Sequence, residues 1–129
     1  MALPDVLVVE DDADLNELIG AYVCMAGLSC RSALTGSDAI REIETKVPAA
    51  VVLDLMLPDM SGFDICRRIK GTPACSTTRV IILTAMDSEA SRQHGREVGA
   101  DEYLTKPFDP DHLMQTVARH ASGEPAPER

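Results

Sequence analysis

Short apolar runs alternate with amphipathic stretches along most of the chain. The strongest runs are short and rich in Val, Ile and Leu. Strands that are buried on both faces of a parallel sheet have this composition. We therefore expect strands at Val6 to Val9, Ala50 to Leu53 and Val80 to Leu83, with a weaker strand at Glu102 to Leu104 and one of mixed character at Ser29 to Leu34.

Helical periodicity fills the intervals between these runs. Gly27 and Gly71 each follow such a stretch and suit a helix end. Gly95 lies inside the fourth stretch and weakens it by about 1 kcal/mol relative to Ala. Asp109 precedes Pro110 and fits the N-cap of the last helix. Helices are expected over about 13–26, 37–47, 62–70, 88–98 and 110–121.

The order of elements, a strand followed by a helix five times over, predicts the fold class. Such alternation indicates an α/β protein with a doubly wound five-stranded parallel sheet, helices on both faces and right-handed crossovers. A chain of 129 residues is near the usual size of one domain, which we place at residues 1–121. Residues 122–129 are polar and rich in Pro, so we expect a flexible tail or the start of a linker there.

Composition and charge narrow the function classes. The content of 45% hydrophobic and 26% charged residues is typical of a soluble globular protein. The net charge of −9 argues against direct nucleic-acid binding, which relies on Lys and Arg to neutralise phosphates. No apolar run approaches the roughly 20 residues of a membrane span, and no secretory signal pattern opens the chain. We therefore expect no membrane contact and a cytoplasmic location, with the four cysteines as free thiols.

Polar residues that can carry chemistry follow the strands directly. Acids at 10–12 follow the first strand, Asp54 the third, Thr84 the fourth, and Lys106 lies just past the last. The carboxyl ends of parallel strands meet at one edge, where open α/β sheets bind ligands. Carboxylates about 4 Å apart repel by roughly 4 kcal/mol at an effective dielectric constant near 20, so either the pKa of some carboxyl is raised or a hard divalent ion binds. Mg²⁺ prefers oxygen ligands, and acids, Mg²⁺, Lys and a hydroxyl together equip a site for phosphoryl transfer.

Four sequence blocks make this interpretation specific. VLVVEDD at 6–12, VVLDLMLPDMSGFD at 51–64, VIILTA at 80–85 and GADEYLTKPF at 99–108 resemble, in order and separation, the signature blocks of response-regulator receiver domains. The resemblance covers about residues 4–121 and implies the flavodoxin-like strand order 2-1-3-4-5. It also implies a phosphoacceptor signalling switch, which is no enzyme beyond catalysing its own phosphorylation and dephosphorylation.

The resemblance assigns roles position by position. Asp54 resembles the phosphoacceptor, and Asp11 and Asp12 resemble the acidic pair that holds Mg²⁺ directly or through water. The backbone carbonyl of Met56 would be a further metal ligand, and Lys106 resembles the lysine that pairs with the phosphoryl oxygens. The resemblance further implies that the Thr84 hydroxyl bonds to the phosphoryl group and that Tyr103 occupies the aromatic switch position. It implies a cis peptide bond between Lys106 and Pro107. Met56 and Met86 are apolar at positions where such side chains would restrict the water that hydrolyses the acyl phosphate.

The same resemblance implies partners for the domain. A sensor histidine kinase or a histidine phosphotransfer protein would donate the phosphoryl group. The surface of the fourth helix, fifth strand and fifth helix would then control an output domain or target protein. The sequence leaves open whether phosphorylation produces a homodimer through the last two helices. The sequence names neither kinase nor target, and it does not tell a stand-alone regulator from a piece of a longer protein.

Simpler interpretations compete for individual residues. Asp11 and Asp12 could merely cap the helix that follows them, because Asp suits N-caps. Tyr103 could be a partly exposed strand aromatic without a switching role. Acids outside the strand ends, and histidines without ligand spacing, are expected at the surface: Asp59, Asp64, His94, His112 and His120.

Other function classes also compete. A phosphatase of the haloacid-dehalogenase type would need a second acid two residues after the nucleophile, where Met56 stands. A flavin or nucleotide binder would need a phosphate-cradling loop after the first strand, where the acids at 10–12 repel phosphate instead. A receiver-like interaction module that is never phosphorylated is excluded only by a phosphorylation assay.

Overall fold

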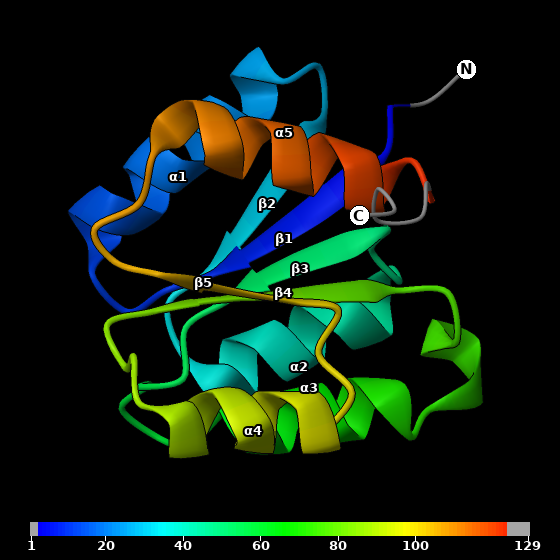
Figure 1. The fold of residues 1–129 in the computed structure, drawn as a ribbon. Coiled ribbons are helices and arrows are strands. Elements are labelled where there is room, and N and C mark those ends of the chain that lie inside the picture. The colour runs from blue at the N-terminus through cyan, green and yellow to red at the C-terminus, as the bar shows by residue number, and fades with distance from the viewer. Residues whose placement is uncertain (1–2, 124–129) are drawn as a thin grey trace.

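One parallel sheet organises the molecule. The structure, a computed structural model, describes residues 3–123. Its five strands run in the order β2-β1-β3-β4-β5, which confirms the predicted fold class and strand order (Figure 1). The strands are β1 (Asp5–Val9), β2 (Ser29–Ala33), β3 (Ala50–Leu53), β4 (Arg79–Thr84) and β5 (Glu102–Thr105). The helices are α1 (Ala13–Met25), α2 (Gly36–Thr45), α3 (Gly62–Lys70), the short 3₁₀ helix η1 (Pro73–Cys75), α4 (Glu89–Glu97) and α5 (Pro110–Ala121).

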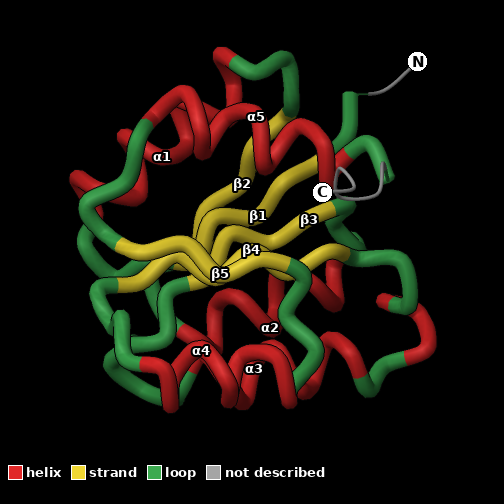
Figure 2. The backbone as a smooth tube through the Cα atoms, in the orientation of Figure 1, coloured by secondary structure: helices red, strands yellow, loops and turns green. Residues whose placement is uncertain are grey.

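Helices cover both faces of the sheet. Figures 1 and 2 show α1 and α5 on one face and α2, α3 and α4 on the other. Successive strand residues point to opposite faces, so each strand feeds two separate cores. In β1, Val6 and Val8 pack with α1 and α5, whereas Leu7 and Val9 pack against the layer of α2 and α3. The near-continuous apolar runs therefore reflect burial on both faces, as predicted.

Each α-helix begins at a polar N-cap that the preceding loop supplies. The cap side chains accept a backbone N–H from the first turn, which satisfies one of the donors left free at a helix start. Asp109 caps α5 as expected, and the predicted bounds of the helices differ from the observed ones by only one or two residues. The other caps are Asp12, Thr35, Ser61 and Ser88.

The prediction that all three histidines lie at the surface is wrong for two of them. His112 is exposed, but His94 is half-buried and stacks on the Phe63 ring with centroids 4.0 Å apart. His120 is only 3% exposed, and its two ring nitrogens lie 3.1 Å from Arg79 Nη1 and 3.1 Å from Glu102 Oε1. A guanidinium only donates, so Nδ1 of His120 accepts from Arg79 and Nε2–H donates to Glu102. The clue was helical spacing, because His120 shares the buried face of α5 with Val117.

The four cysteines are free, which confirms the expectation. Cys66 and Cys75 are buried, Cys30 is half-buried and Cys24 is exposed. Burial raises the pKa of the Cys30 and Cys66 thiols to about 11, so both are protonated at neutral pH.

Across residues 3–123, no helix has the length and apolar character that a membrane crossing demands. The tail expected at 122–129 lies mostly outside the described residues.

Candidate functional site

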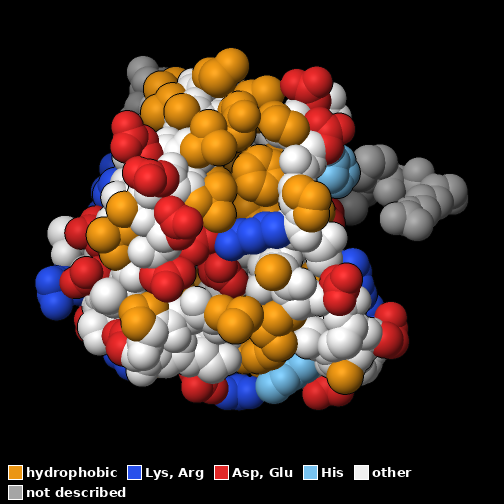
Figure 3. Space-filling model, turned by 90° about the vertical axis from the view of Figure 1, so that its left-hand side faces the viewer, with side chains coloured by type: hydrophobic (Ala, Val, Ile, Leu, Met, Phe, Trp, Pro, Cys, Tyr) orange, Lys and Arg blue, Asp and Glu red, His pale blue; other side chains and the backbone are white. Residues whose placement is uncertain are grey.

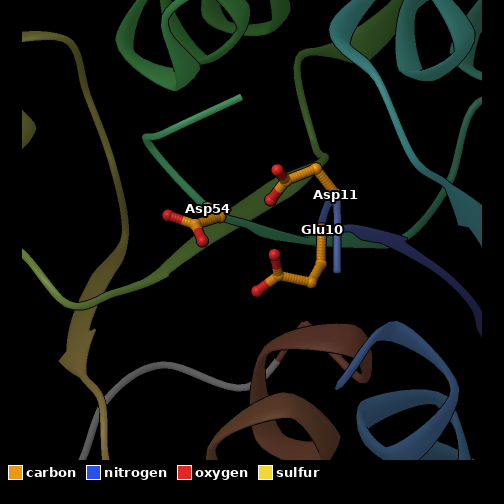
Figure 4. A group of neighbouring side chains, drawn as sticks. All are labelled: Glu10, Asp11 and Asp54. Atoms are coloured by element: carbon orange, nitrogen blue, oxygen red, sulfur yellow. The ribbon is translucent and has the colours of Figure 1, made fainter. Parts of the chain in front are cut away.

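Three acidic side chains meet where β1 and β3 end. Glu10 and Asp11 directly follow β1, and Asp54 directly follows β3, which pairs with β1. One carboxylate oxygen of each lies within 4.8 Å of the others, around one small space (Figure 4). Asp11 is exposed, whereas Glu10 is only 2% and Asp54 only 7% exposed. The structure thus brings together two of the predicted acids, and adds Glu10.

Lys106 reaches the same space from beyond β5. Its Nζ donates to Asp54 Oδ2 at 2.8 Å and also to Glu10 Oε1. The ammonium therefore bridges the two buried carboxylates and offsets their repulsion. Lys106 and Pro107 are joined by a cis peptide bond, as the resemblance implied. Glu10 was noticed in the sequence only as part of an acidic run; an acid directly after a fully buried strand was the signal that it needs a cation.

Burial and the lysine pull the pKa values of this group in opposite directions. Burial is the largest influence on Glu10, and it raises the pKa of that carboxyl above its ordinary value although Lys106 opposes it. Burial also acts to raise the pKa of Asp54, but hydrogen bonds from Lys106 and the Met56 N–H outweigh it, so this pKa is lowered. For Lys106, burial is outweighed by the bonds to Asp54 and Glu10, and the pKa is raised. Asp54 is therefore an ionised carboxylate near neutral pH, ready to act as a nucleophile.

Thr84 and the backbone after Asp54 complete the inner wall. The Met56 N–H donates to Asp54 Oδ1 at 3.1 Å, which fixes the loop to the carboxylate. Thr84 is fully buried at the end of β4, and its Oγ1 accepts from the Met86 N–H at 3.3 Å. Met56 itself is 62% exposed.

Asp12 has another role in the structure. Its Oδ1 accepts from the Leu15 N–H at 3.1 Å, and it is the N-cap of α1. Among residues 3–123, the acidic group close enough to share an ion comprises Glu10, Asp11 and Asp54 without Asp12. The simpler interpretation weighed for Asp12, helix capping, is therefore present in the structure. A contact of Asp12 to a metal through water stays a prediction.

Tyr103 lies beside the loop that follows Thr84. It is half-buried, and its hydroxyl donates to the Met86 carbonyl at 2.7 Å. Burial raises the pKa of the Tyr103 phenol, so it remains a hydrogen-bond donor at neutral pH. The aromatic at the expected switch position is thus hydrogen-bonded to the same residue whose N–H contacts Thr84.

Asp59 ties the loop between β3 and α3 to the start of α2. Its side chain is exposed, as expected, but its carboxylate accepts from the Gly36 N–H at 2.8 Å, the Ser37 N–H at 2.9 Å and the Ser37 hydroxyl at 2.8 Å. The Ser37 hydroxyl is the main reason why the pKa of Asp59 is lowered. Asp64, also exposed as expected, forms an ion pair with Arg67 at 2.8 Å.

Replacing Asp59 with Ala should lower the melting temperature at neutral pH, because two N–H groups at the start of α2 lose their acceptor. A carboxylate with a lowered folded-state pKa contributes stability that is fully present above its ordinary pKa of about 4, and this stability is lost as the pH falls through the lower, folded-state value. The melting temperatures of the native protein and of Asp59→Ala, measured from neutral pH to below about 4, should therefore converge as the pH falls. Asp64→Ala is the control, and an equal, pH-independent loss in both variants would contradict the capping role.

The arrangement can hold a cation and present a nucleophile. Carboxylate oxygens are the ligands that hard divalent ions prefer, and Glu10, Asp11 and Asp54 offer them within reach of one ion. The pocket opens on the face shown in Figure 3, where a basic side chain lies among acids. Hydrophobic side chains gather beside it, over the side of the molecule that carries α1 and α5.

Comparisons with known proteins agree with this geometry. Residues 6–118 match the family model described as "Response regulator receiver domain". The chain is 38% identical over 112 residues to the transcriptional regulatory protein GltR of Pseudomonas aeruginosa, covering 87% of this chain and 46% of that protein. It is 36% identical over 115 residues to the phosphate regulon transcriptional regulatory protein PhoB of Rhizobium meliloti, covering 89% of this chain and 51% of that protein.

Solved structures show the same similarity. The response regulator DrrB of Thermotoga maritima, described as an OmpR/PhoB homologue, superposes with a TM-score of 0.83 at 37% identity. That match covers 95% of this chain and 54% of the DrrB chain. A structure of the DrrB receiver domain activated with BeF3 gives a TM-score of 0.84 and covers 99% of its chain.

The curated relatives correct one expectation. The chain spans about half the length of the curated relatives it matches, and both relatives above are named as transcriptional regulatory proteins. The expectation of no direct nucleic-acid contact is therefore too broad. It was drawn from the net charge of these 129 residues, and that charge does not describe the part of the relatives that the match does not cover.

Three findings point to the same family. The family model matches most of the chain, the two relatives are each more than 30% identical to it, and the sheet has the strand order that the resemblance implied. Response regulators act with kinases and with output domains, and their receiver domain is a signalling switch. This chain belongs to the response-regulator receiver-domain family.

Proposed function

We propose that the chain accepts a phosphoryl group on Asp54 in a Mg²⁺-dependent reaction and thereby switches the surface formed by α4, β5 and α5. The observation that carries this proposal is the single pocket shared by Asp54, Glu10, Asp11 and Lys106. Asp64, by contrast, lies in an exposed ion pair with Arg67.

Each residue of the pocket has a distinct part in the proposal. An Asp54 oxygen attacks the phosphorus, while the bond to the donor's imidazole nitrogen or carboxylate breaks. Asp11, Asp54 and the Met56 carbonyl would hold Mg²⁺, with Asp12 and Glu10 contributing directly or through water. The ion supplies charge neutralisation for the phosphoryl oxygens. Lys106, now held between Glu10 and Asp54, pairs with those oxygens once they arrive.

The switch starts from the hydrogen bonds around Thr84. A phosphoryl group adds about −1.5 to −2 charges and strong acceptor oxygens at Asp54. These oxygens attract the Thr84 hydroxyl, which now accepts from the Met86 N–H. Because the Met86 carbonyl accepts from the Tyr103 hydroxyl, the change reaches the ring at the edge of α4 and β5. Phosphorylation thus biases a population between two conformations and creates neither.

The same proposal covers hydrolysis of the acyl phosphate. The protein would catalyse its own phosphorylation and dephosphorylation, without a separate substrate. Met56 and Met86 follow Asp54 and Thr84 by two positions, and bulky apolar side chains there restrict the attacking water. A long-lived phosphorylated state is the expected consequence.

The partners follow from the family and from the surface. A sensor histidine kinase or histidine phosphotransfer protein would dock on the face of Figure 3, where apolar side chains adjoin the acids. On α1, Leu18 is 46% exposed, and Leu15 and Tyr22, three positions before it and four after it on the helix, are partly buried. We place this exchange in the cytoplasm. Residues 1–121 would form the receiver domain and 122–129 a tail or linker, with an output domain, target protein or second copy as the recipient of the signal.

The direct test is labelling with a small acyl-phosphate donor. Intact mass spectrometry should show one added phosphoryl group in the presence of Mg²⁺, no addition after chelation, and loss of the group with hydroxylamine, which cleaves acyl phosphates. Peptide mapping should locate it at Asp54. Labelling that persists without a divalent ion, or that maps to another residue, would refute the proposal.

Mg²⁺ alone should stabilise the folded protein. An ion that binds only the folded state stabilises by mass action, by about 2.7 kcal/mol at a concentration one hundred times its Kd. Thermal unfolding in Mg²⁺ should therefore give a higher melting temperature than unfolding in NaCl of equal ionic strength. Asp11→Asn should remove most of the increase, and Asp64→Asn should keep it. An unchanged melting temperature of the native protein in saturating Mg²⁺ would argue against a metal site.

A further inference from the structure

The ring of Tyr103 occupies a space that exists because residue 95 has no side chain. Gly95 is buried inside α4, and a Cβ placed there would lie 2.9 Å from Cδ2 and 3.3 Å from Cε2 of Tyr103. Real Cβ atoms essentially never approach another heavy atom as closely as 2.9 Å. If residue 95 were Ala, one of the two would have to shift, and the ring, which is the end of a side chain, is the more movable partner.

Two further contacts hold the ring at this position. Tyr103 lies opposite Ile82 in the β4–β5 register, and Ile82 Cδ1 would itself be 3.4 Å from the added Cβ. The guanidinium of Arg92, one turn before Gly95 on α4, lies 5.2 Å from the ring centroid, within range of a cation–π contact. The ring is therefore enclosed by α4 and β4, with Gly95 as the point of closest approach.

This position is the one that links the ring to the candidate phosphorylation site. The Tyr103 hydroxyl donates to the Met86 carbonyl at 2.7 Å, and the Met86 N–H donates to Thr84 Oγ1 at 3.3 Å. A ring displaced outward from Gly95 loses its bond to Met86. Residue 95 thus decides whether this connection between Thr84 and the α4–β5 surface can form.

We propose that Gly95 is a positioning residue of the switch: the missing side chain admits the Tyr103 ring to its inner site and so lets the ring respond to the state of Asp54. The switching role rests on the proposed function, whereas the placement of the ring does not. Gly inside a helix is unfavourable compared with Ala, so α4 gives up stability at this position, and the contact with the ring is what the missing side chain permits.

The first experiment places the ring without any phosphoryl group. The chain has two tyrosines, Tyr22 and Tyr103, so labelling with 3-fluorotyrosine gives two ¹⁹F resonances, which Tyr22→Phe assigns. Gly95→Ala should move the Tyr103 resonance to the position of a solvent-exposed tyrosine and leave that of Tyr22 unchanged. Gln93→Ala, an exposed change on the same helix, should move neither. An unchanged Tyr103 resonance in Gly95→Ala overturns the inference.

The second experiment measures coupling to the pocket. Titration with beryllofluoride and Mg²⁺, which mimics the phosphoryl group, should show about tenfold weaker apparent affinity in Gly95→Ala, within the usual range of coupling between sites. In a Tyr103→Ala background, adding Gly95→Ala should leave the affinity unchanged. An equal loss with and without the tyrosine shows that residue 95 does not act through the ring. If the unaltered protein fails to bind the mimic while the ¹⁹F shift is seen, the proposed function fails and the placement of the ring stands.

Discussion

Asp54→Asn is expected to fold normally and to accept no phosphoryl group from an acyl-phosphate donor. The amide keeps the shape of the side chain, and its single oxygen can still accept one of the two bonds that Asp54 receives, from Lys106 Nζ to Oδ2 at 2.8 Å and from the Met56 N–H to Oδ1 at 3.1 Å. It lacks the nucleophilic carboxylate, whose lowered pKa keeps it ionised at neutral pH. Intact mass spectrometry should therefore show background labelling only, a loss limited by the sensitivity of the assay.

The matched control is Asp64→Asn, which removes an exposed acid in an ion pair with Arg67. It should be labelled as completely as the unaltered protein. Circular dichroism must show that both variants keep their helices, because an unfolded chain would also resist labelling. Full labelling of folded Asp54→Asn would mean that another residue is the phosphoacceptor.

Lys106→Met is expected to have the second largest effect, on stability and on metal binding together. The substitution leaves the buried carboxylates of Glu10 and Asp54 without their shared cation. Breaking a buried ion pair costs about 3–5 kcal/mol, and because one side of this pocket is open to water we expect a loss of about 2–3 kcal/mol. The loss of stability should grow as the pH rises above about 4, since both carboxylates are then ionised and repel each other.

Mg²⁺ should reverse much of this loss. The ammonium and the metal compete for the same carboxylate oxygens, so Lys106→Met should bind Mg²⁺ more tightly than the unaltered protein. Calorimetric titration and thermal unfolding with and without Mg²⁺ measure both effects. Lys70→Met is the control, because Lys70 pairs at 2.7 Å with Asp101 at similar exposure outside the acidic group. A Lys106→Met protein whose Mg²⁺ affinity falls would show that the lysine assists the metal.

Much of the fold could be predicted because its signals are repeated along the chain. Buried parallel strands need continuous apolar runs, and each helix carries a periodic face, so the order of elements was visible. The strand order came from the resemblance and is confirmed by the pairing of β1 with both β2 and β3. Caps at Ser61 and Ser88 were overlooked, because Ser is common in loops as well as at helix starts.

The site could be predicted down to its acids, but not to the contacts between them. A run of three acids after β1 offers equivalent candidates, and only the turn into α1 decides that Glu10 points to Lys106 while Asp12 caps the helix. Spacing along the chain cannot show such a choice, because it depends on backbone direction over one or two residues. The bonds to Asp59 could not be predicted for a related reason, since the N–H donors at the start of α2 lie more than twenty positions away.

Gly95 shows how a local rule can mislead. In the sequence it only lowers the expected strength of a helix. In the structure its cost to α4 is matched by the aromatic ring that it admits from β5, a contact between segments that sequence periodicity treats separately.

The sheet also acts as a partition between two independent interiors. The residues that pack with α1 and α5 and those that pack with α2, α3 and α4 form separate clusters, divided by the backbone of the strands. Substitutions that repack one layer leave the van der Waals contacts of the other in place. The layer of α1 and α5 and the layer of α2, α3 and α4 can therefore diverge on separate evolutionary paths, joined only at the rim where the strands end.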